Sequence, residues 1–255
     1  MPDRNGYPHG TPSWVDIGTD VEGAKAFYAA LFGWDAQEAG PPEQSGGYGF
    51  FLKGGKMVAG FGPQQNPGPP FWSTYVSVDD AELIAKNVEA AGGTIVVAPM
   101  DVMGQGHMAV FQDPTGAFIS IWQPGEHRGA QLVNEPGAFC WNELNTRDTA
   151  AAKGFYESVF GWTGVTHEGE MAYTEFQIGG TSIAGMMNMP PPVPAEVPAH
   201  WLVYFAVEDV DAALAKVGEL GGTALTGVMT IPSGSRFAVV ADPQGAAFGI
   251  ITLND

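Results

Sequence analysis

The segment GTPSWVDIGTDVEGAKAFYAALFGW (residues 10–34) returns as GAFCWNELNTRDTAAAKGFYESVFGW at residues 137–162. Both copies keep a tryptophan, an acidic residue two positions later, and the motifs Phe–Tyr and Phe–Gly–Trp in the same order. Two further pairs stay in step: FWSTYVSVDD (71–80) with HWLVYFAVED (200–209), and GHMAVFQDPTGAF (106–118) with SRFAVVADPQGAA (235–247). The chain is therefore an internal tandem repeat, and one copy of it defines the fold of both.

Each copy divides into two smaller modules. Residues 14–18 predict a strand, and residues 20–32 predict a helix because apolar residues recur there with a 3.6-residue period. Strands at 48–52 and 57–61 follow, joined by a Gly–Gly hairpin turn. The same order then begins again at Trp72, so the second module is expected to fold like the first.

The second module predicts a strand over residues 72–78 and a helix over 80–91, with Asp80 as its N-cap. Three strands close the module, near 94–98, 107–112 and 117–122. The sequence Asp–Pro–Thr–Gly between the last two is typical of a type I turn. The second copy of the repeat follows the same order.

One module leaves a curved sheet face that needs a partner, and the neighbouring module supplies it. The sequence therefore predicts an α+β fold of tandem βαβββ modules, paired into two open barrel-like domains that each enclose a pocket. The first domain is expected over residues 1–125, with modules at about 10–63 and 70–124, and the second over 135–255, with modules at about 137–189 and 199–253.

The composition limits the possible partners. The 255 residues include 28 acidic and 10 basic ones, for a formal net charge of −18. A surface this acidic repels nucleic acid and anionic lipid, which argues against both as partners. The one cysteine, Cys140, is interpreted as a small apolar residue of a strand. No run approaches the roughly 18 apolar residues of a membrane span, so we expect a cytoplasmic protein, either a monomer or a homodimer.

A family resemblance rests on these motifs. The first strand, the Asp at the helix start, Phe–Tyr–x–x–Leu–Phe–Gly–Trp and the closing Asp–Pro–x–Gly turn resemble the vicinal-oxygen-chelate superfamily of glyoxalases, bleomycin-resistance proteins and extradiol dioxygenases. The tandem form is similar to two-domain actinobacterial proteins labelled hydroxylases, of the SgaA type. The resemblance covers residues 10–253 and implies the fold, but not the reaction, because this fold hosts several chemistries.

The resemblance also implies where a metal would bind. In this superfamily the ligands are a His early in the first strand, a His opening the fifth strand and a Glu shortly after the Asp–Pro–x–Gly turn. In the two copies those positions hold Trp14 and Trp141, Ser73 and Leu202, and Ser120 and Gly249. None of them offers the imidazole or carboxylate that a divalent metal needs. The sequence predicts no metal and no other cofactor.

Two carboxylates are the first candidates for catalysis or binding. Asp16 and Glu143 each lie two residues after the repeated tryptophan, and alternate residues of a strand share a face. They are therefore expected at the floor of each pocket, as a base or a hydrogen-bond acceptor. The structural alternative is that each carboxylate caps a loop or pairs with a lysine of the following helix, Lys25 or Lys153.

Three further polar residues are candidates. His107 and Arg236 occupy equivalent positions in the two copies, six residues before the Asp–Pro–x–Gly turn. They either contact a ligand or pair with a cross-strand carboxylate. His200 precedes a repeated tryptophan at a strand start, and is either a ligand contact or a structural residue.

Aromatic residues recur in register and could stack on a flat ligand. The candidates are Trp14, Trp72, Tyr75, Trp141, Trp201 and Tyr204. The alternative is that they belong to the hydrophobic core, as buried aromatic residues usually do.

Three functions fit these features. The first and favoured one is a protein that binds an apolar or aromatic small molecule in its barrel pockets without a metal. The second is a cofactor-free enzyme acting on an aromatic or polyketide-like metabolite, in which the pocket carboxylate takes a proton and His107 or Arg236 stabilises charge. The third is a lyase or dioxygenase that holds a metal through unusual ligands. Whether the chain is an enzyme stays open, and a lyase, isomerase or oxygenase would be the class.

Overall fold

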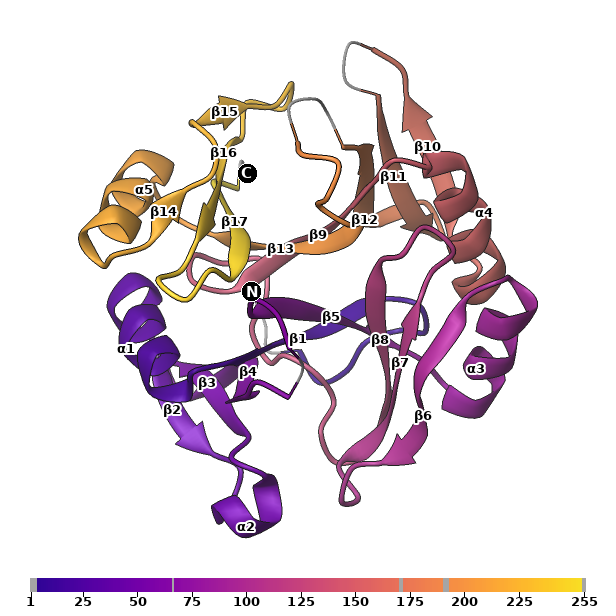
Figure 1. The fold of residues 1–255 in the computed structure, drawn as a ribbon, viewed down its shortest axis with the longest axis horizontal. Coiled ribbons are helices and arrows are strands. Elements are labelled where there is room, and N and C mark those ends of the chain that lie inside the picture. The colour runs from indigo at the N-terminus through magenta and orange to yellow at the C-terminus, as the bar shows by residue number, and fades with distance from the viewer. Residues whose placement is uncertain (1–3, 66, 170–171, 190–192, 254–255) are drawn as a thin grey trace.

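The computed structural model describes residues 4–65, 67–169, 172–189 and 193–253, which form two curved sheets, one from each copy of the repeat (Figure 1). The elements of the first copy are β1 (Pro12–Thr19), α1 (Val21–Phe32), β2 (Asp35–Glu38), α2 (Pro42–Ser45), β3 (Gly49–Lys53), β4 (Lys56–Pro63), β5 (Phe71–Ser77), α3 (Ala81–Ala90), β6 (Thr94–Asp101), β7 (Gly106–Gln112) and β8 (Phe118–Pro124). Those of the second copy are β9 (Phe139–Thr146), α4 (Thr149–Phe160), β10 (Thr163–His167), β11 (Tyr173–Ile178), β12 (Thr181–Asn188), β13 (His200–Ala206), α5 (Val210–Glu219), β14 (Thr223–Ala224), β15 (Met229–Thr230), β16 (Arg236–Ala241) and β17 (Ala247–Ile251).

The two sheets have the same topology. The first runs β2-β3-β4-β1-β5-β8-β7-β6, and the second runs β10-β11-β12-β9-β13-β17-β16-β14, with β15 paired to β16. In both, the first strand of one module lies antiparallel to the first strand of the next, as β1 does to β5. Neither sheet closes on itself. The predicted α+β fold of two open, curved domains is thereby confirmed.

The local signals in the sequence explain the ends of the helices. The Asp20 side chain accepts a hydrogen bond from the backbone of Gly23 and caps α1, and Gly33 ends the helix at φ 70°. Asp80 caps α3 in the same way. The edge strand β2 and the short helix α2 were not expected from the sequence. All four side chains of β2, in the sequence Asp–Ala–Gln–Glu, are exposed, so no alternation of apolar and polar residues marks the strand.

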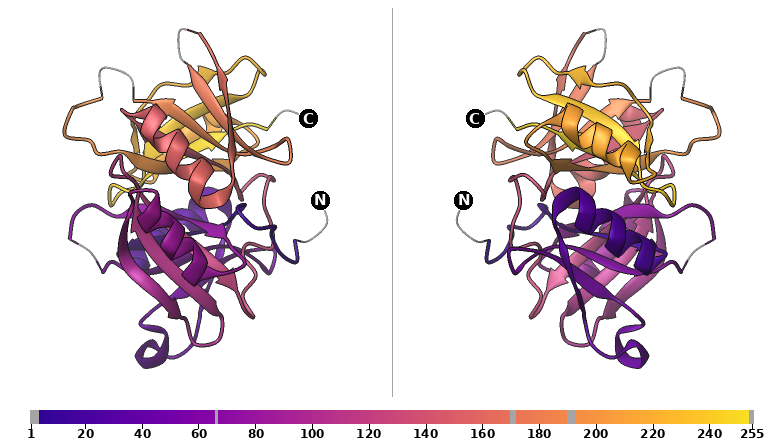
Figure 2. Two further views of the ribbon diagram at one scale, coloured as in Figure 1. Left: turned by 90° about the vertical axis from the view of Figure 1, so that its right-hand side faces the viewer. Right: turned by 90° about the vertical axis from the view of Figure 1, so that its left-hand side faces the viewer.

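Helices α1, α3, α4 and α5 lie where the two domains meet, whereas α2 lies at the outer end of the first domain (Figure 1). Figure 2 shows α3 beside α4 on one side of the molecule and α1 beside α5 on the other. As a result each hydrophobic core contains residues of both copies. Tyr28 of α1 packs against Phe248 of β17 with ring centroids 5.8 Å apart, and Phe111 of β7 packs against Phe155 of α4 at 6.0 Å. In each copy, the sheet face that carries the helices is therefore buried against the other copy.

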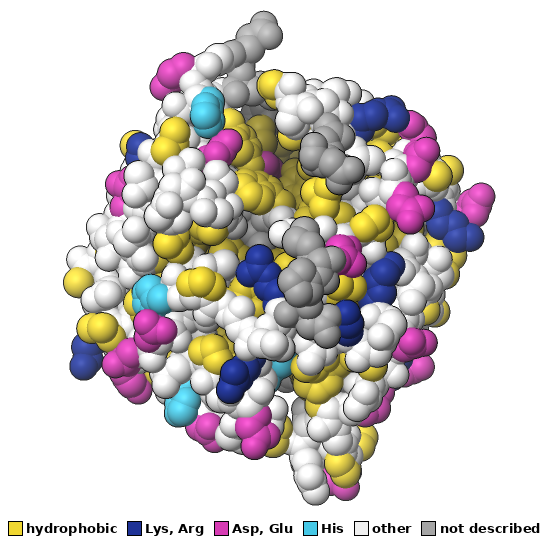
Figure 3. Space-filling view, turned by 180° about the vertical axis from the view of Figure 1, so that it is seen from behind, with side chains coloured by type: hydrophobic (Ala, Val, Ile, Leu, Met, Phe, Trp, Pro, Cys, Tyr) yellow, Lys and Arg dark blue, Asp and Glu magenta, His cyan; other side chains and the backbone are white. Residues whose placement is uncertain are grey.

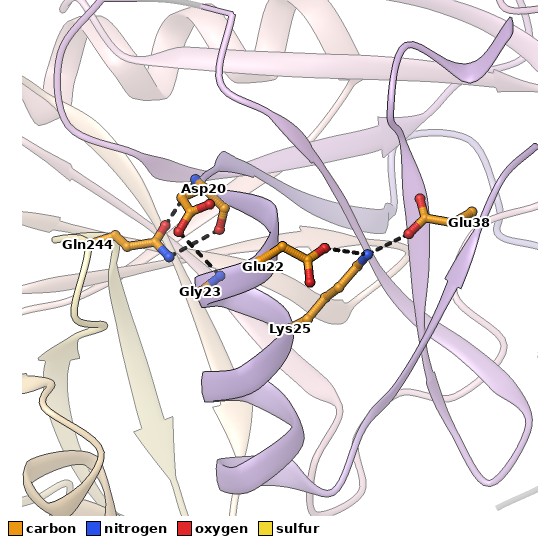
Figure 4. A network of polar contacts seen from close by, with 6 residues as sticks. All are labelled: Asp20, Glu22, Gly23, Lys25, Glu38 and Gln244. Carbon is orange, nitrogen blue, oxygen red and sulfur yellow. Dashed lines mark hydrogen bonds and ion pairs between the residues drawn. The ribbon is translucent and has the colours of Figure 1, made fainter. Parts of the chain in front are cut away.

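Reciprocal hydrogen bonds join the repeated motifs of one copy to those of the other. The Tyr28 hydroxyl donates to the Asp242 carboxylate at 3.0 Å, and the Tyr156 hydroxyl donates to Asp113 at 2.8 Å. Each bond links the Phe–Tyr motif of one copy to the Asp–Pro–x–Gly turn of the other. Figure 4 shows a related contact, in which Gln244 of the second turn bonds to the backbone of Asp20 at the start of α1.

The Phe–Gly–Trp motifs make a second reciprocal pair. Trp34 Nε1 donates to the carbonyl of Gly137 at 2.7 Å, and Trp162 Nε1 donates to the carbonyl of Gly10 at 2.8 Å. The motifs that reveal the repeat thus hold the two copies together. Within the described ranges, no helix has the length and apolar character needed to cross a membrane.

Candidate functional site

Each sheet has an inner face that points away from the helices. Val15 and Ile17 of β1 are buried in the core beside α1, so the alternate residues Trp14 and Asp16 point to the other side. We call this side the first inner face, defined by Trp14, Asp16, Tyr48 and Tyr75. The second inner face is defined by the equivalent residues Trp141, Glu143, Tyr173 and Tyr204.

The first inner face has a carboxylate at its floor. The Tyr75 hydroxyl donates to Asp16 Oδ2 at 2.9 Å, and the Tyr48 hydroxyl donates to the same oxygen at 3.1 Å. Trp14 Nε1 in turn donates to the Tyr48 hydroxyl at 3.0 Å. Four residues from two strands and one loop are thus connected in one polar cluster inside an aromatic wall.

The second inner face repeats this cluster. The Tyr204 hydroxyl donates to Glu143 Oε1 at 3.1 Å, and Tyr173 also hydrogen-bonds to this carboxylate. Trp141 Nε1 donates to the Tyr173 hydroxyl at 2.8 Å, and the Asn145 amide lies 3.4 Å from Glu143 Oε1. The two copies therefore build one chemical arrangement, although one uses Asp and the other Glu.

Two glycines make room for the clusters. A Cβ atom on Gly60 would overlap the Tyr48 hydroxyl, and a Cβ atom on Gly185 would overlap the Tyr173 hydroxyl. Gly60 lies beside Asp16 in the parallel pair of β1 and β4, as Gly185 lies beside Glu143 in β9 and β12. A glycine at this point lets the phenol reach the carboxylate.

Burial without a cation controls the charge of both carboxylates. Burial raises the pKa of Asp16 to about 6, and the hydrogen bonds from tyrosine and serine hydroxyls only partly offset it. Burial raises the pKa of Glu143 for the same reason. The predicted alternative partner of Asp16, Lys25, is instead bonded to Glu22 and Glu38 (Figure 4).

The two inner faces differ in what covers them. Residues 125–133, which we call the strap, lie against the first inner face, and the ring of His127 packs on Trp14 with centroids 4.5 Å apart. Trp14 is therefore 3% exposed. Trp141 is half-buried, and no ring within the described ranges packs on it. Figure 3 shows a hollow over the second domain with largely hydrophobic walls.

A cavity of about 360 Å³ adjoins Trp141 where the N-terminal segment meets the start of β9 and β12. It is lined by Arg4, Tyr7, Pro8, Thr11, Pro12, Val133, Asn134, Phe139, Cys140, Trp141, Asn142, Ile178, Thr181, Ser182 and Ile183. Burial raises the pKa of Cys140 to about 12, which leaves the thiol protonated and poorly reactive. The cysteine is a half-buried strand residue, close to its expected role.

Two predicted ligand-binding tryptophans lie in the core. Trp72 Nε1 donates to the Tyr28 hydroxyl at 3.0 Å, and Trp201 Nε1 donates to the Tyr156 hydroxyl at 2.9 Å. Both side chains point to the helices, away from the carboxylates. Trp72 and Trp201 therefore belong to the hydrophobic core, which was the alternative to ligand binding. The other four predicted aromatic residues lie around the two carboxylates: Trp14 and Tyr75 near Asp16, and Trp141 and Tyr204 near Glu143.

The other three polar candidates lie away from the clusters. His107 is exposed on β7. Arg236 is exposed and forms an ion pair with Asp211 of α5, so its partner is a carboxylate on a helix and not the cross-strand carboxylate expected. The Nδ1 atom of His200 lies 2.9 Å from the carbonyl of Pro198 at the start of β13. None of these contacts includes Asp16 or Glu143.

Tyr48, Tyr173 and His127 were not predicted from the sequence. Tyr48 and Tyr173 complete the clusters. Tyr48 directly precedes β3 and Tyr173 opens β11, and the next strand in each copy contains an Ala–Gly step, Ala59–Gly60 or Ala184–Gly185. This recurrence was a readable signal. His127 had none, because it lies in the linker and has no counterpart in the other copy.

The family's metal positions fall on the inner faces but do not fit a metal. Ser73 pairs with Asp16 in the sheet, and Leu202 pairs with Glu143. Ser120 and Gly249 lie beside Tyr75 and Tyr204 in the parallel pairs. Across the described ranges no three His, Cys, Asp or Glu side chains come together in a way that could hold a metal ion. The donor set that this family uses is replaced by hydroxyl, aliphatic and indole groups.

These features define a class of protein. The chain belongs to the Glyoxalase/Bleomycin resistance protein/Dioxygenase superfamily, whose model matches residues 17–121 and 129–250. Among curated relatives, it is 41% identical to CFP32 of Mycobacterium tuberculosis (strain CDC 1551 / Oshkosh), which carries the name glyoxylase, over 98% of both chains. It is 38% identical to the anthracycline biosynthesis protein DnrV of Streptomyces peucetius, over 98% of this chain and 95% of that one.

Solved structures share the fold at low sequence identity. The Mn(II)-bound glyoxalase from Novosphingobium aromaticivorans has a TM-score of 0.67 and 15% identity, with 96% of this chain and 82% of that chain covered. The 2,2',3-trihydroxybiphenyl 1,2-dioxygenase from Sphingomonas wittichii strain RW1 has a TM-score of 0.66 and 13% identity, with coverage of 96% and 91%. At this identity the likeness concerns the fold alone.

Proposed function

We propose that the chain binds a small, planar, apolar or aromatic molecule on the second inner face, without a metal. The observation that carries this proposal is Glu143, a carboxylate only 7% exposed that accepts hydrogen bonds from Tyr204 and Tyr173 and, among the residues that the structure describes, contacts no cation. Leaving a carboxylate buried in this way costs stability. A ligand that donates a hydrogen bond to Glu143 would offset this cost.

The walls around Glu143 suit a ring. Trp141 offers a half-exposed indole, and Tyr204 packs edge-on against Phe237 with centroids 6.1 Å apart. A flat ligand would lie against these aromatic side chains, and a hydroxyl or N–H group on it would donate to Glu143. Stacking and apolar burial of this extent support micromolar affinity, on the order of −8 kcal/mol.

The names of relatives support the same ligand class. DnrV and DauV are named as anthracycline biosynthesis proteins, at 38% and 36% identity. Anthracyclines are planar, polycyclic and hydroxylated, so they combine the ring and the hydrogen-bond donor that the second inner face would take. Fold analogy alone does not select the ligand.

A cofactor-free enzyme is the second candidate, favoured by the raised pKa of Glu143. A carboxylate with a raised pKa is a stronger base and holds a proton closer to neutral pH. It would take a proton from an acidic O–H or C–H group of an aromatic or polyketide-like substrate and return it elsewhere on the same molecule. Such a transfer balances without an oxidant, and it is an isomerase-type reaction.

Calorimetric titration with a hydroxylated anthraquinone tests the binding proposal. We expect saturable binding with one site per chain and micromolar affinity, which Trp141→Ala and Glu143→Gln each weaken at least tenfold. His200→Ala is the matched control and should bind like the wild type. Absence of saturable binding across a panel of planar aromatic compounds would refute the proposal. Proton exchange between the compound and solvent, measured by NMR and lost in Glu143→Gln, would favour the enzyme.

A further inference from the structure

The strap is held on the first inner face by its own backbone. The amides of Ala130 and Gln131 donate to the carbonyls of Ser13 and Met57, both at 2.8 Å. The His127 carbonyl accepts a hydrogen bond from Trp122 Nε1 at 2.8 Å. These bonds tie the strap to the start of β1, the start of β4 and the end of β8, which surround the Asp16 cluster.

The strap places one aromatic ring inside an aromatic wall. The His127 ring lies 4.5 Å from Trp14, 5.6 Å from Trp122 and 5.8 Å from Phe50, measured between centroids. The residue is 8% exposed, and neither ring nitrogen has a hydrogen-bond partner among the described residues. A buried polar atom without a partner is unfavourable, so an apolar side chain would serve better as mere filling.

The ring occupies the position that is open in the other copy. Trp14 and Trp141 make the same hydrogen bond to a tyrosine of the carboxylate cluster, but within the described ranges only Trp14 has other aromatic rings packed against it, those of His127 and Phe50. The imidazole therefore lies where a ligand ring would lie if the second inner face were filled.

We propose that the first inner face is a second binding site of the same class, and that the strap is its resident occupant with His127 in the place of the ligand's ring. An external neutral, planar compound of one or two rings competes with the strap for this site. The ligand class rests on the function proposed for the second inner face. Neutrality follows from the site itself, because the groups packed on His127 are the uncharged rings of Trp14, Phe50 and Trp122.

Two variants of one residue separate an open site from a closed one. His127→Ala removes the resident ring, and His127→Leu replaces it with an apolar side chain that keeps the site filled. The probe is indole, added to the full-length chain at pH 8. We expect His127→Ala to bind one more indole than the wild type at the first inner face, at least tenfold more tightly than the wild type does there. The NMR signals of the Trp14 and Trp122 indole N–H groups should shift with it.

The controls make each outcome decisive. His127→Leu should behave like the wild type or bind less, and thermal melts show whether each variant is folded. In the wild type, saturating indole should speed hydrogen exchange at the amides of Ala130 and Gln131, because binding displaces the strap. A folded His127→Ala without the extra site would overturn the proposal, and so would unchanged exchange in the wild type.

The background Glu143→Gln separates this proposal from the function of the second inner face. In His127→Ala/Glu143→Gln the first site should still bind indole with shifts at Trp14 and Trp122. If that binding persists while the second inner face binds nothing in any variant, the proposed function fails and the binding site on the first inner face is supported. If only the Trp141 signal responds, the reverse holds.

Discussion

The two inner faces contain the same cluster, but they differ in how far the repeated tryptophan is covered. In the first, Trp14 is 3% exposed beneath His127, and in the second, the equivalent Trp141 is half-buried. The walls and the floor come from the repeated modules, whereas the cover comes from the linker, which is not repeated. Duplication therefore copied the cluster, whereas the covering of the tryptophan by residues 125–133 is confined to the first copy.

The repeated motifs divide into two groups with different tasks. Phe–Tyr, Phe–Gly–Trp and Asp–Pro–x–Gly join the two copies, as the bond between Tyr28 and Asp242 illustrates. The tryptophan and the carboxylate two residues later form the clusters on the inner faces. Substitutions in the first group should therefore have equal effects on stability in the two copies, whereas substitutions in the second group should have different effects in the two copies.

The largest effect is expected at the symmetric contacts between the copies. Asp113 accepts from Tyr156 and from two backbone amides of its own turn, and Asp242 does the same with Tyr28. Replacing either with Ala removes several charge-assisted bonds and leaves a buried phenol unpaired. We expect each change to lower the free energy of unfolding by about 3 kcal/mol or more.

Urea denaturation checks this pair of variants. The two losses should agree within about 1 kcal/mol, because the contacts are equivalent by the repeat. A loss confined to one variant would show that the copies do not depend on each other equally. Pro243→Ala, in the same turn but exposed, is the matched control and should stay near the wild type.

A change of similar size is expected in the pH dependence of stability. Burial lowers the pKa of His127 to about 4 from its ordinary value of 6.5, so its contribution is present above pH 6.5 and lost as the pH falls through 4. Burial raises the pKa of Asp16 from 3.8 to about 6, so its contribution is present at low pH and lost as the pH rises through 6. The two effects oppose each other between pH 4 and 6.

Because the two pH effects oppose each other, replacing either His127 or Asp16 should expose the pH dependence that the other residue causes. His127→Leu should gain stability relative to the wild type as the pH falls from 6.5 to 4, by about 3 kcal/mol in total, since one pKa unit is worth about 1.4 kcal/mol. Asp16→Asn should show the opposite slope relative to the wild type over pH 4–6. Chemical denaturation across this range measures both. Parallel curves for His127→Leu and the wild type would mean that the imidazole does not stay neutral in the folded state.

The sequence predicted the fold and part of the site, for different physical reasons. Strands and helices followed from periodicity and caps, because those signals are local. Asp16 was placed correctly beside Trp14 because the spacing within one strand fixes the face. The face of Trp72 depends on its partner strand, where it pairs with the core residue Ile17. His127 depends on the path of a linker, which no pattern in the sequence specifies.

A smaller effect is expected when the two carboxylates are compared directly. Glu143→Gln should weaken binding of a hydroxylated anthraquinone at least tenfold, about 1.4 kcal/mol, because a carboxylate accepts a hydrogen bond more strongly than an amide does. Asp16→Asn should leave that affinity unchanged, because the His127 ring already packs against Trp14 on that face. Both variants should fold with wild-type stability or better at pH 8, since each removes a buried charge.

Titration and melting of both single variants and of the double variant test this expectation. If both singles lose stability while affinity stays at the wild-type value, the carboxylates belong to the scaffold. Equal loss of affinity in both singles would mean that the strap does not keep ligands from the first inner face.

The smallest effect is expected at His107 and Arg236, which occupy equivalent positions but lie outside both clusters. His107 is exposed, and Arg236 is paired with Asp211 at the surface. Solvent-exposed ion pairs contribute little, so His107→Ala and Arg236→Ala should each change the free energy of unfolding by less than about 1 kcal/mol. Binding of the anthraquinone should stay within twofold of the wild type for both. A tenfold loss in Arg236→Ala alone would place the ligand over β16 as well as Glu143, and would extend the open site toward the edge of the second sheet.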